Sequence, residues 1–313
     1  MLSRIANSLL WMGRYLERAQ HTSRYINVHY FSSLDAPVLS RKEFVLHSIC
    51  DMTSLEADFS ADFDDHDIIF KIMMDEHNPV SIKSCIVNAR ENARGARDVL
   101  SSELWESINK FYHSVNSFPT KNLSEEKILD FTQMVCSQTA IVNSYIENSL
   151  LHNDTWSLIR LGTHIEAAGQ ISRIIISKMT DIKKAGKEKL GKAVENFQSV
   201  TLLKSTEAYD MSRIHYKTMP SLTHTLEFLI LNREFPRSII YNLEEVDAGL
   251  RKIKIGAMEQ KESPDFFSGK LISSFKFLTI EEIEPDILPF MEKTLTDIYY
   301  LGSLVEKKIA LIK

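Results

Sequence analysis

Charged side chains at helical spacing are the residues of this sequence whose chemistry is easiest to recognise. Residues 11–24 contain Gly13, Glu17 and Arg24, and residues 161–173 repeat their types and spacing about half a chain later. Because a helix turns by about 100° per residue, a glutamate and an arginine seven positions apart lie on one face, two turns from each other. Each copy therefore carries an acid and a base on a common face. At one constant offset the matched pairs are Gly13 and Gly162, Glu17 and Glu166, Ala19 and Ala168, Ser23 and Ser172, and Arg24 and Arg173.

The chemistry that this pattern favours is the recognition of an anion. Arginine presents a planar fork of N–H donors that suits a carboxylate or a phosphate. Two interpretations remain open: an ion-pair network that locks the first helix against the helix around Arg94, or a groove between those helices in which Glu17 orients arginines toward a ligand or partner. Both interpretations need the same residue types at the same spacing. The candidate ligand-binding residues from this pattern are Arg14, Glu17, Arg18, His21, Arg24, Arg90, Glu91, Arg94 and Arg97.

Motifs for catalysis or metal binding are weaker. The sequence has no glycine-rich phosphate loop, no Gly-x-Ser-x-Gly elbow and no Cys-x-x-Cys pair. Glu17 and His21, like Glu43 and His47, lie four residues apart on one helix face, but neither pair has an obvious second set of ligands. We therefore predict no metal site and no cofactor. If the protein is an enzyme, Glu17 is the candidate general acid or base, although we favour a protein that is not an enzyme.

The glycines at the two matched positions are unfavourable inside a helix. Each costs about 1 kcal/mol relative to alanine, so the recurrence of Gly13 as Gly162 needs a physical reason. A missing side chain allows another backbone or a ligand to approach closely. We favour close packing of helices as the reason.

The elements that must position these residues are helices. Leu, Ile, Met, Glu, Lys and Ser are abundant, whereas the 313 residues include 10 Gly and 8 Pro, which is typical of helical proteins. Apolar residues at spacings of three and four predict helices over residues 3–30 and 41–57. The arginine-rich helix is predicted over residues 81–100, and another begins at residue 101. Further helices are predicted over residues 124–151 and 155–178, and over 221–232, 236–255 and 286–313. The residues between 192 and 213 are also predicted to be helical.

The repeated features predict two related helical units. Besides the matched helices, Pro79-Val80-Ser81 and Pro236-Arg237-Ser238 place the same kind of helix start at an equivalent point of each half, with proline in the first turn. We predict an all-α protein with a first unit at residues 1–153 and a second, diverged unit at residues 154–313. The two units are expected to pack as one helical bundle.

Two charged segments allow more than one interpretation. Residues 58–67 are acidic, and we favour a solvated loop with helix-capping aspartates over a cation site, because the glycine and distal glutamate of a calcium loop are missing. Residues 179–192 are lysine-rich and contain two glycines. For this second segment we favour a mobile loop over a basic patch.

Composition and charge exclude several classes of function. The formal charge is −5 and no long segment is strongly basic, so nucleic acid is not an expected partner. Cys50, Cys85 and Cys136 are widely spaced and predict reduced thiols rather than a disulfide framework. The first residues lack the continuous apolar run of a signal peptide, and no stretch approaches the roughly 18 apolar residues of a membrane span. We expect a cytoplasmic protein without a membrane partner.

Three segments of the sequence are distinctive as a set. They are residues 7–19 (NSLLWMGRYLERA), residues 88–105 (NARENARGARDVLSSELW) and residues 231–238 (LNREFPRS). In this order they resemble the bacterial alpha-E domain family, and the resemblance spans essentially the whole chain. It implies an all-helical fold and adds Glu103 and Trp105 to the candidate ligand-binding residues. The family's characteristic positions would be Arg14, Glu17, Arg18, Glu91, Arg94, Arg97, Glu103 and Trp105.

The resemblance also implies partners. Members of this family are typically encoded beside a circularly permuted ATP-grasp protein and often a transglutaminase-like protein, which implies a role in forming or processing peptide-like amide bonds. The expected partners are therefore an ATP-grasp-type ligase, a transglutaminase-like protein, and a peptide or small anionic ligand.

For the function we expect an accessory or scaffold protein of such a system. The alternatives are an enzyme of the same pathway that uses Glu17, and a purely structural ion-pair network with the function elsewhere. Thr163 and Ala167 stand where Arg14 and Arg18 stand in the first copy, so we expect any site to favour the first copy.

Overall fold

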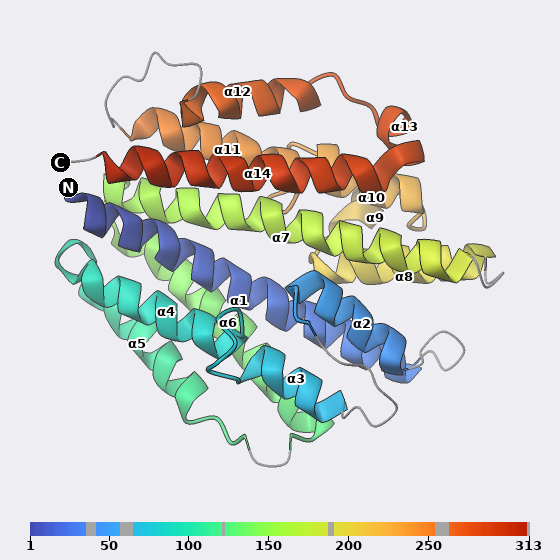
Figure 1. Cartoon of the computed structure of the whole chain (residues 1–313), viewed down its shortest axis with the longest axis horizontal. Coiled ribbons are helices and arrows are strands. Elements are labelled where there is room, and N and C mark those ends of the chain that lie inside the picture. Colours follow the sequence, from blue (N-terminus) through green and yellow to red (C-terminus); the bar gives the residue numbers. More distant parts are fainter. Residues whose placement is uncertain (36–41, 57–64, 121–122, 187–190, 254–262, 312–313) are drawn as a thin grey trace.

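Two long helices run side by side through the middle of the molecule (Figure 1). They are α1 (Ser3–Asp35) and α7 (Asp154–Gly186), each of 33 residues, and they carry the two matched segments. The computed structural model describes the whole chain except residues 36–41, 57–64, 121–122, 187–190, 254–262 and 312–313. Within this described part every regular element is a helix and there is no strand, so the all-α prediction is confirmed.

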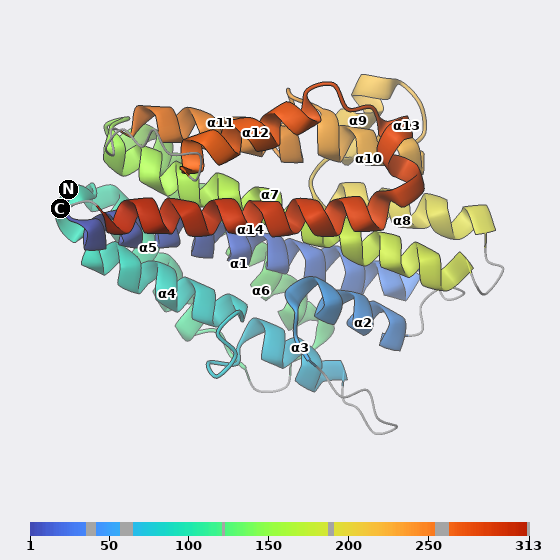
Figure 2. The same cartoon turned by 45° about the horizontal axis from the view of Figure 1, so that its top comes forward.

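The other helices form a layer on each side of the central pair. On one side α4 (Ile82–Gly95) and α6 (Glu125–Ser149) pack on α1, and α5 (Ser102–Asn116) packs against both of them. On the other side α11 (Ile239–Lys252) and α14 (Ile287–Ala310) pack on α7, as the turned view in Figure 2 also shows. The remaining elements are α2 (Lys42–Thr53), α3 (Asp65–Met73), α8 (Gly191–Ser205), α9 (Tyr209–Tyr216), α10 (Leu222–Leu231), α12 (Pro264–Phe275), α13 (Ile280–Ile283) and the short 3-10 helices η1 (Arg97–Val99) and η2 (Glu284–Asp286).

Serine side chains start several of these helices. The hydroxyl of Ser81 accepts a hydrogen bond from the N–H of Ser84 at the start of α4, and Ser238 accepts one from Tyr241 at the start of α11. Each cap satisfies one of the N–H groups that a helix start leaves without a partner. The predicted helix starts at these two joints are therefore confirmed, but the helices begin after serine caps and the prolines precede them.

Two of the predicted segments differ clearly from the structure. The arginine-rich helix ends at Gly95 instead of continuing to residue 100, and Arg97 lies in η1. The predicted loop over residues 179–192 is wrong for most of its length, because α7 continues to Gly186 and α8 begins at Gly191. Residues 187–190 lie outside the described part of the chain, as do residues 58–64 of the acidic segment.

The predicted division between residues 153 and 154 falls in the connection between the two halves. Helix α6 ends at Ser149 and α7 begins at Asp154. Each half therefore opens with a helix of 33 residues. Whether the halves are related units stays a prediction.

The two matched glycines lie where α1 crosses α7. A Cβ atom at Gly162 would lie 2.0 Å from the carbonyl oxygen of Leu10 in α1, and one at Gly13 would lie 2.3 Å from the carbonyl oxygen of Ile159 in α7. Both distances are far shorter than a carbon–oxygen contact allows, and both obstructing atoms belong to the backbone. The prediction of close helix packing at these glycines is confirmed.

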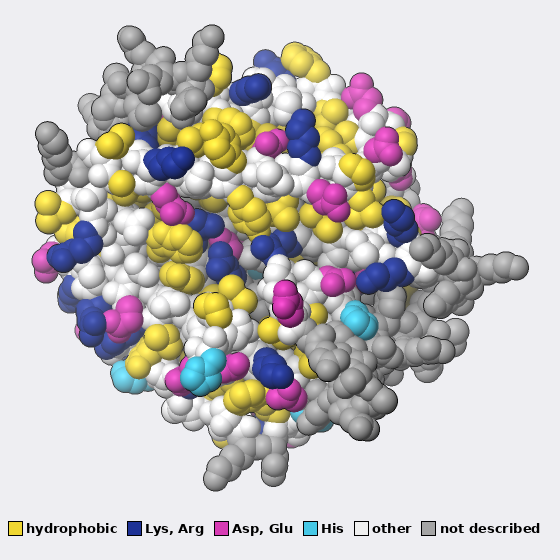
Figure 3. Space-filling model, in the orientation of Figure 1, with side chains coloured by type: hydrophobic (Ala, Val, Ile, Leu, Met, Phe, Trp, Pro, Cys, Tyr) yellow, Lys and Arg dark blue, Asp and Glu magenta, His cyan; other side chains and the backbone are white. Residues whose placement is uncertain are grey.

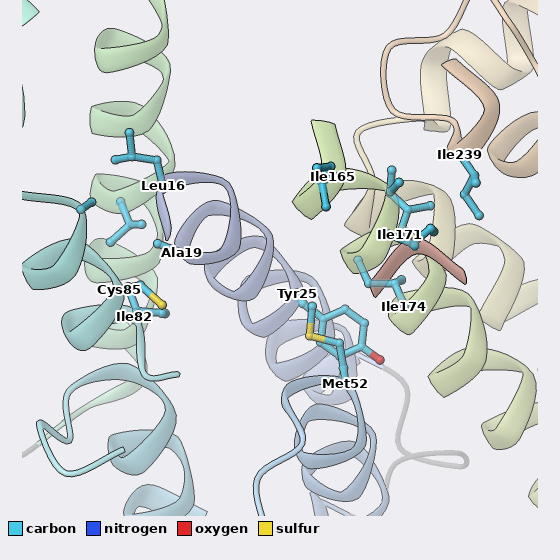
Figure 4. Packing of buried hydrophobic residues seen from close by; sticks show 14 of the residues in the cluster. Leu16, Ala19, Tyr25, Met52, Ile82, Cys85, Ile165, Ile171, Ile174 and Ile239 are labelled. Carbon is cyan, nitrogen blue, oxygen red and sulfur yellow. The ribbon is translucent and has the colours of Figure 1, made fainter. Parts of the chain in front are cut away.

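The apolar core continues on both sides of this crossing. Figure 4 shows Ala19 of α1 beside Ile82 and Cys85 of α4. On the other side of the crossing, Ile174 of α7 lies on the side of α11, which carries Ile239. All five side chains are buried. Since burying one large aliphatic side chain stabilises a fold by about 1.5–3 kcal/mol, these layers fix the orientation of the central helices.

The surface carries charges of both signs. On the face shown in Figure 3, basic and acidic side chains of the described residues are interspersed and form no continuous basic band. Among the described helices none combines the length and the apolar character needed to cross a membrane.

The crossing gives the first testable prediction. Replacement Gly162→Ala should lower the free energy of unfolding by about 3 kcal/mol or more, because the new methyl group meets a backbone oxygen and the helices must separate. Urea denaturation measures this change. The matched control is Gly269→Ala in α12, where a Cβ atom has no neighbour within 4 Å and should leave stability unchanged or raise it by up to about 1 kcal/mol. Equal effects of the two substitutions would contradict the proposed role of the crossing.

Candidate functional site

The crossing places the two matched glutamates in separate groups of charged residues. Glu166 of α7 accepts hydrogen bonds from Arg18 Nε at 2.7 Å and Nη2 at 3.1 Å, and from Arg14 Nε at 3.1 Å. Gln170 Nε2 donates to the same carboxylate at 2.8 Å, and Arg14 Nη1 also donates to Glu306 of α14 at 2.9 Å. We call these five residues the Glu166 cluster. It joins α1, α7 and α14 through direct hydrogen bonds.

Every buried polar atom of the Glu166 cluster has a hydrogen-bond partner. Burial alone would raise the pKa of Glu166, but the Arg18 and Arg14 guanidinium groups more than offset it and lower the pKa to about 2. The guanidinium group of Arg14 also stacks 4.3 Å from the centre of the Trp11 ring. A buried carboxylate whose hydrogen bonds are complete in this way is a structural link between helices.

Glu17 is surrounded differently. Its Oε1 atom is 3.0 Å from His21 Nε2 and 4.0 Å from Nη1 of Arg237, which lies just before α11. Nearby, the Glu207 carboxylate receives Arg24 Nη2 on one oxygen at 2.5 Å and Arg237 Nη2 on the other at 2.8 Å. We call these five residues the Glu17 cluster. It gathers side chains from α1, from the turn after α8 and from the turn before α11.

The Glu17 cluster is incompletely satisfied. His21 Nδ1, Arg24 Nη1 and Arg237 Nη1 are buried and have no hydrogen-bond partner. Arg24 is only 9% exposed, so bulk solvent has little access to its guanidinium group. An unpaired buried donor costs about 1–3 kcal/mol, and more when the group is charged. Such groups in an otherwise well-packed protein are typical of functional sites.

The protonation states in the Glu17 cluster follow from burial and from its neighbours. Burial opposes ionisation of Glu17, but the hydrogen bond with His21 and the charge of Arg237 lower its pKa below the usual value, so Glu17 is ionised at neutral pH. Burial lowers the pKa of His21 and keeps its imidazole neutral. Burial, together with repulsion from Arg237, also lowers the pKa of Arg24. The cluster therefore holds two close arginines that repel each other.

Glu207 has an unusual backbone conformation. It follows the end of α8 with φ of +54°, in the left-handed region that favours glycine at this helix position. A residue with a side chain costs about 1–2 kcal/mol there. Its side chain is 50% exposed, while its carboxylate contacts both arginines. The position thus carries a carboxylate despite a conformational disadvantage.

The arginines of α4 form a third, separate group. Glu91 pairs with Arg90 at 2.6 Å and with Arg94 at 2.5 Å, both on its own helix. The Arg90 guanidinium group also lies 4.8 Å from the centre of the Tyr112 ring and 5.7 Å from that of Trp105 in α5. The Arg94 side chain is 64% exposed. This group faces α5 and solvent.

The expected meeting of Glu17 with the Arg90–Arg97 helix is therefore wrong. Within the described residues, no ion pair or hydrogen bond joins Glu17 to Arg90, Arg94 or Arg97. The physical reason is that the arginines of α4 pair with Glu91 on the same helix and with aromatic rings of α5. Arg14 and Arg18 of α1 pair instead with Glu166 of α7, across the crossing. Two other candidates also lie outside both clusters: Arg97 is near Trp105, and Glu103 is exposed in the first turn of α5. Arg173, the matched counterpart of Arg24, contacts Tyr299 and Ser54 instead.

Sequence reasoning missed Glu207 and Arg237. Arg237 stands in the proline-serine joint whose first-half counterpart carries Val80, and this departure from the repeat was the available signal. Glu207 has no sequence signal, because only the tertiary fold brings the end of α8 to α1. The sequence identifies the two matched glutamates. It does not predict that Glu166 pairs with Arg14 and Arg18 of the first copy.

A further buried polar network joins α1, α2 and α7. The hydroxyl groups of Tyr25 and Ser48 lie 2.7 Å apart, and Ser48 donates to Asp181 at 2.9 Å. Lys178 Nζ donates to the same carboxylate at 2.6 Å. Ser177 completes the network through its hydroxyl at 3.0 Å from that of Tyr25. No buried side-chain atom here lacks a partner, so we assign this network a structural role.

The Glu17 cluster suits anion binding better than metal binding or proton transfer. It offers arginine N–H donors in excess of the acceptors that contact them. In the described part of the chain no group of three His, Cys, Asp or Glu side chains is arranged to hold a metal ion. Glu17 is ionised, so it is not available as a general acid at neutral pH, and its lowered pKa makes it a weak general base.

The low pKa of Glu166 gives a pH-dependent prediction. Because its folded pKa of about 2 lies below the usual 4.5, its contribution to stability is present above pH 4.5 and is lost as the pH falls toward 2. Glu166→Gln should lower the free energy of unfolding near pH 7 by about 3–5 kcal/mol, since it removes the counter-charge of Arg18 and leaves Arg14 with Glu306 alone. Urea denaturation at several pH values should show the difference from wild type shrinking below pH 4.5.

The control for this experiment is Glu91→Gln on α4. It removes the same charge from partly exposed ion pairs, which contribute less than about 1 kcal/mol. A Glu166→Gln difference that stays constant from pH 7 to pH 3, or one no larger than that of Glu91→Gln, would contradict the structural role of the Glu166 cluster.

The chain is similar to much longer mycobacterial proteins. An uncharacterised protein of Mycobacterium bovis is 23% identical over 277 residues, which cover 80% of this chain and 30% of that protein. Two uncharacterised proteins of Mycobacterium tuberculosis strains are 23% and 22% identical over 277 residues, with the same coverage. The chain thus corresponds to less than a third of these relatives. No solved structure matches it.

One dipeptide contributes a residue to each cluster and also matches the motif of a protein family. The sequence contains a single Glu-Arg dipeptide, Glu17-Arg18, and its two side chains enter different clusters. The model of the Alpha-E family, described as a predicted alpha-helical domain with a conserved ER motif, matches residues 1–308. The protein therefore belongs to the Alpha-E family.

Proposed function

We propose that this protein is a non-catalytic accessory or scaffold protein of a system that forms or modifies peptide-like amide bonds. Its partners in this proposal are an ATP-grasp-type ligase, a transglutaminase-like protein, or their anionic peptide substrate. Membership of the Alpha-E family supports the choice of system, through the partners that the resemblance implies. The binding residues in this proposal are those of the Glu17 cluster.

The observation that carries the binding role is the contrast between two glutamates at matched positions. Glu166 and its arginines have complete hydrogen bonds, whereas Arg24 and Arg237 keep buried N–H groups without partners. A network that only held helices together would gain stability by satisfying those groups. Retaining them next to the half-exposed Glu207 favours a site that completes its bonds with another molecule.

The alternative is an enzyme that uses Glu17 as a general acid or base. The hydrogen bond between Glu17 and His21 favours it, because paired acids and imidazoles are common in catalysis. Against it, Glu17 is only 6% exposed and its pKa is lowered, whereas a catalytic acid or base needs access to a substrate proton and works best with a pKa raised toward neutrality. We therefore favour binding over catalysis.

Co-purification tests the proposed partners. The tagged protein, expressed with the ATP-grasp-type ligase and the transglutaminase-like protein encoded nearby, should retain at least one of them in at least one nucleotide state. Arg237→Gln should reduce capture about tenfold or more, because it removes a buried charge from the binding cluster. The control Arg94→Gln removes the same charge from an exposed side chain and should leave capture unchanged. Absence of association in every nucleotide state would remove the proposal.

Glu17→Gln separates binding from catalysis. If Glu17 orients Arg237 for binding, the substitution should lower both stability, by about 1–3 kcal/mol, and partner capture, because Arg237 loses its buried counter-charge. Thermal unfolding, capture and product formation by the reconstituted system are measured together, with Glu91→Gln as the charge-matched control. Loss of product with unchanged stability and unchanged capture would instead establish the enzyme.

A further inference from the structure

We infer that Arg24 and Arg237 form an anion-binding site whose present occupant is the chain's own Glu207 carboxylate, and that a carboxylate or phosphoryl group of a ligand displaces it. This inference rests on the proposed binding role of the Glu17 cluster and assigns the chemical class of its ligand. Glu207 acts as an internal competitor that keeps the site closed until such a group arrives.

The donor geometry supports the site. Each arginine uses one terminal nitrogen on Glu207, with Arg24 Nη2 on one oxygen and Arg237 Nη2 on the other. The second terminal nitrogen of each arginine is buried without a hydrogen-bond partner. A single carboxylate thus leaves donors from both guanidinium groups unused. A phosphoryl group, which has an additional oxygen, or a carboxylate that enters more deeply satisfies more of them.

Burial and charge distinguish the fixed floor of the site from its occupant. Arg24 is 9% exposed, while the side chain of Arg237 is 21% exposed and that of Glu207 is 50% exposed. Glu17 is the fixed counter-charge beneath the arginines, 4.0 Å from Arg237. When Glu207 leaves, two guanidinium groups face one buried carboxylate. The site then carries an excess positive charge in surroundings of low dielectric, which favours an incoming anion.

The turn that carries Glu207 allows its side chain to leave without unfolding the neighbourhood. Thr206 and Ala208 on either side are buried, and the N–H of Ala208 donates to the carbonyl of Leu203 at 2.8 Å, which fixes the backbone. The Glu207 side chain itself is half exposed, so rotation about its side-chain bonds moves the carboxylate into water. The backbone keeps its left-handed conformation in both states.

The Glu166 cluster is the internal comparison. Its carboxylate is 4% exposed and receives hydrogen bonds from three side chains, so no ligand can replace it without separating α1 from α7. The two clusters therefore differ in the solvent exposure of their carboxylates as well as in the completeness of their hydrogen bonds. Among the carboxylates of the two clusters, Glu207 is the one that contacts two arginines and is also half exposed.

Direct binding of small anions to the isolated chain tests the inference. Isothermal titration with inorganic phosphate and, separately, with acetate, at low ionic strength, should show weak binding to the wild type. Glu207→Gln should bind at least one of them about tenfold more tightly, because the competing charge is gone while the side-chain length and backbone strain remain. Adding Arg237→Gln to this variant should abolish the gain, whereas adding Arg94→Gln should not. Preference for phosphate identifies a phosphoryl ligand, and preference for acetate identifies a carboxylate.

Cys136 provides a local probe that does not depend on the arginine variants folding. Burial raises the pKa of this thiol, Arg24 and Arg237 lower it, and Glu207 raises it, so Cys136 lies within electrostatic reach of the site. Cys136 is partly exposed, while Cys50 and Cys85 are buried. Glu207→Gln should therefore speed the reaction of Cys136 with a thiol reagent, and the bound anion should slow it again.

The outcomes separate this inference from the proposed function. Equal affinity of wild type and Glu207→Gln for both anions, or binding that leaves the Cys136 rate unchanged, overturns the site. Anion binding at the site without capture of any partner would keep the site and remove the proposed system. Partner capture without anion binding would keep the proposed system and remove the anion-binding site.

Discussion

The contact on which the structure depends is the approach of two backbones at Gly13 and Gly162. With no side chain at either position, the carbonyl oxygens of Leu10 and Ile159 occupy the space where a Cβ would stand. Helices that cross this closely bring side chains on either side of the crossing within reach of the opposite helix. Arg14 therefore reaches Glu166, and the layers on both sides pack against a fixed central pair.

The same crossing gives two glutamates with one spacing two different surroundings. Glu166 receives its hydrogen bonds from residues already on the central helices and becomes part of the fold. Glu17 depends instead on Arg237, delivered by the turn before α11, and that arginine is shared with Glu207. The protein thus combines a completed polar network, which stabilises, with an incomplete one, which keeps binding capacity at the expense of stability.

Much of the fold was predictable because its causes are local. Apolar spacing predicted the long helices, the two proline-serine joints predicted the starts of α4 and α11, and the recurring glycine predicted close helix packing. The pairing of charges was not predictable, because spacing on one helix states which residues share a face but not which helix that face meets. Arg94 illustrates this limit: its charge matched the pattern, yet its partner is Glu91 on its own helix. Glu207 joined the site through a turn whose place only the complete fold determines.

The split of the Glu-Arg dipeptide has a consequence for how this segment can vary. Consecutive helical residues point about 100° apart, so Glu17 contacts one cluster and Arg18 the other. Deleting or inserting one residue between Gly13 and Glu17 would rotate both side chains away from their partners at once, while leaving the helix itself intact. The length of this segment therefore cannot change without loss of both sets of contacts. The constraint on this motif is thus one of register first and of residue identity second.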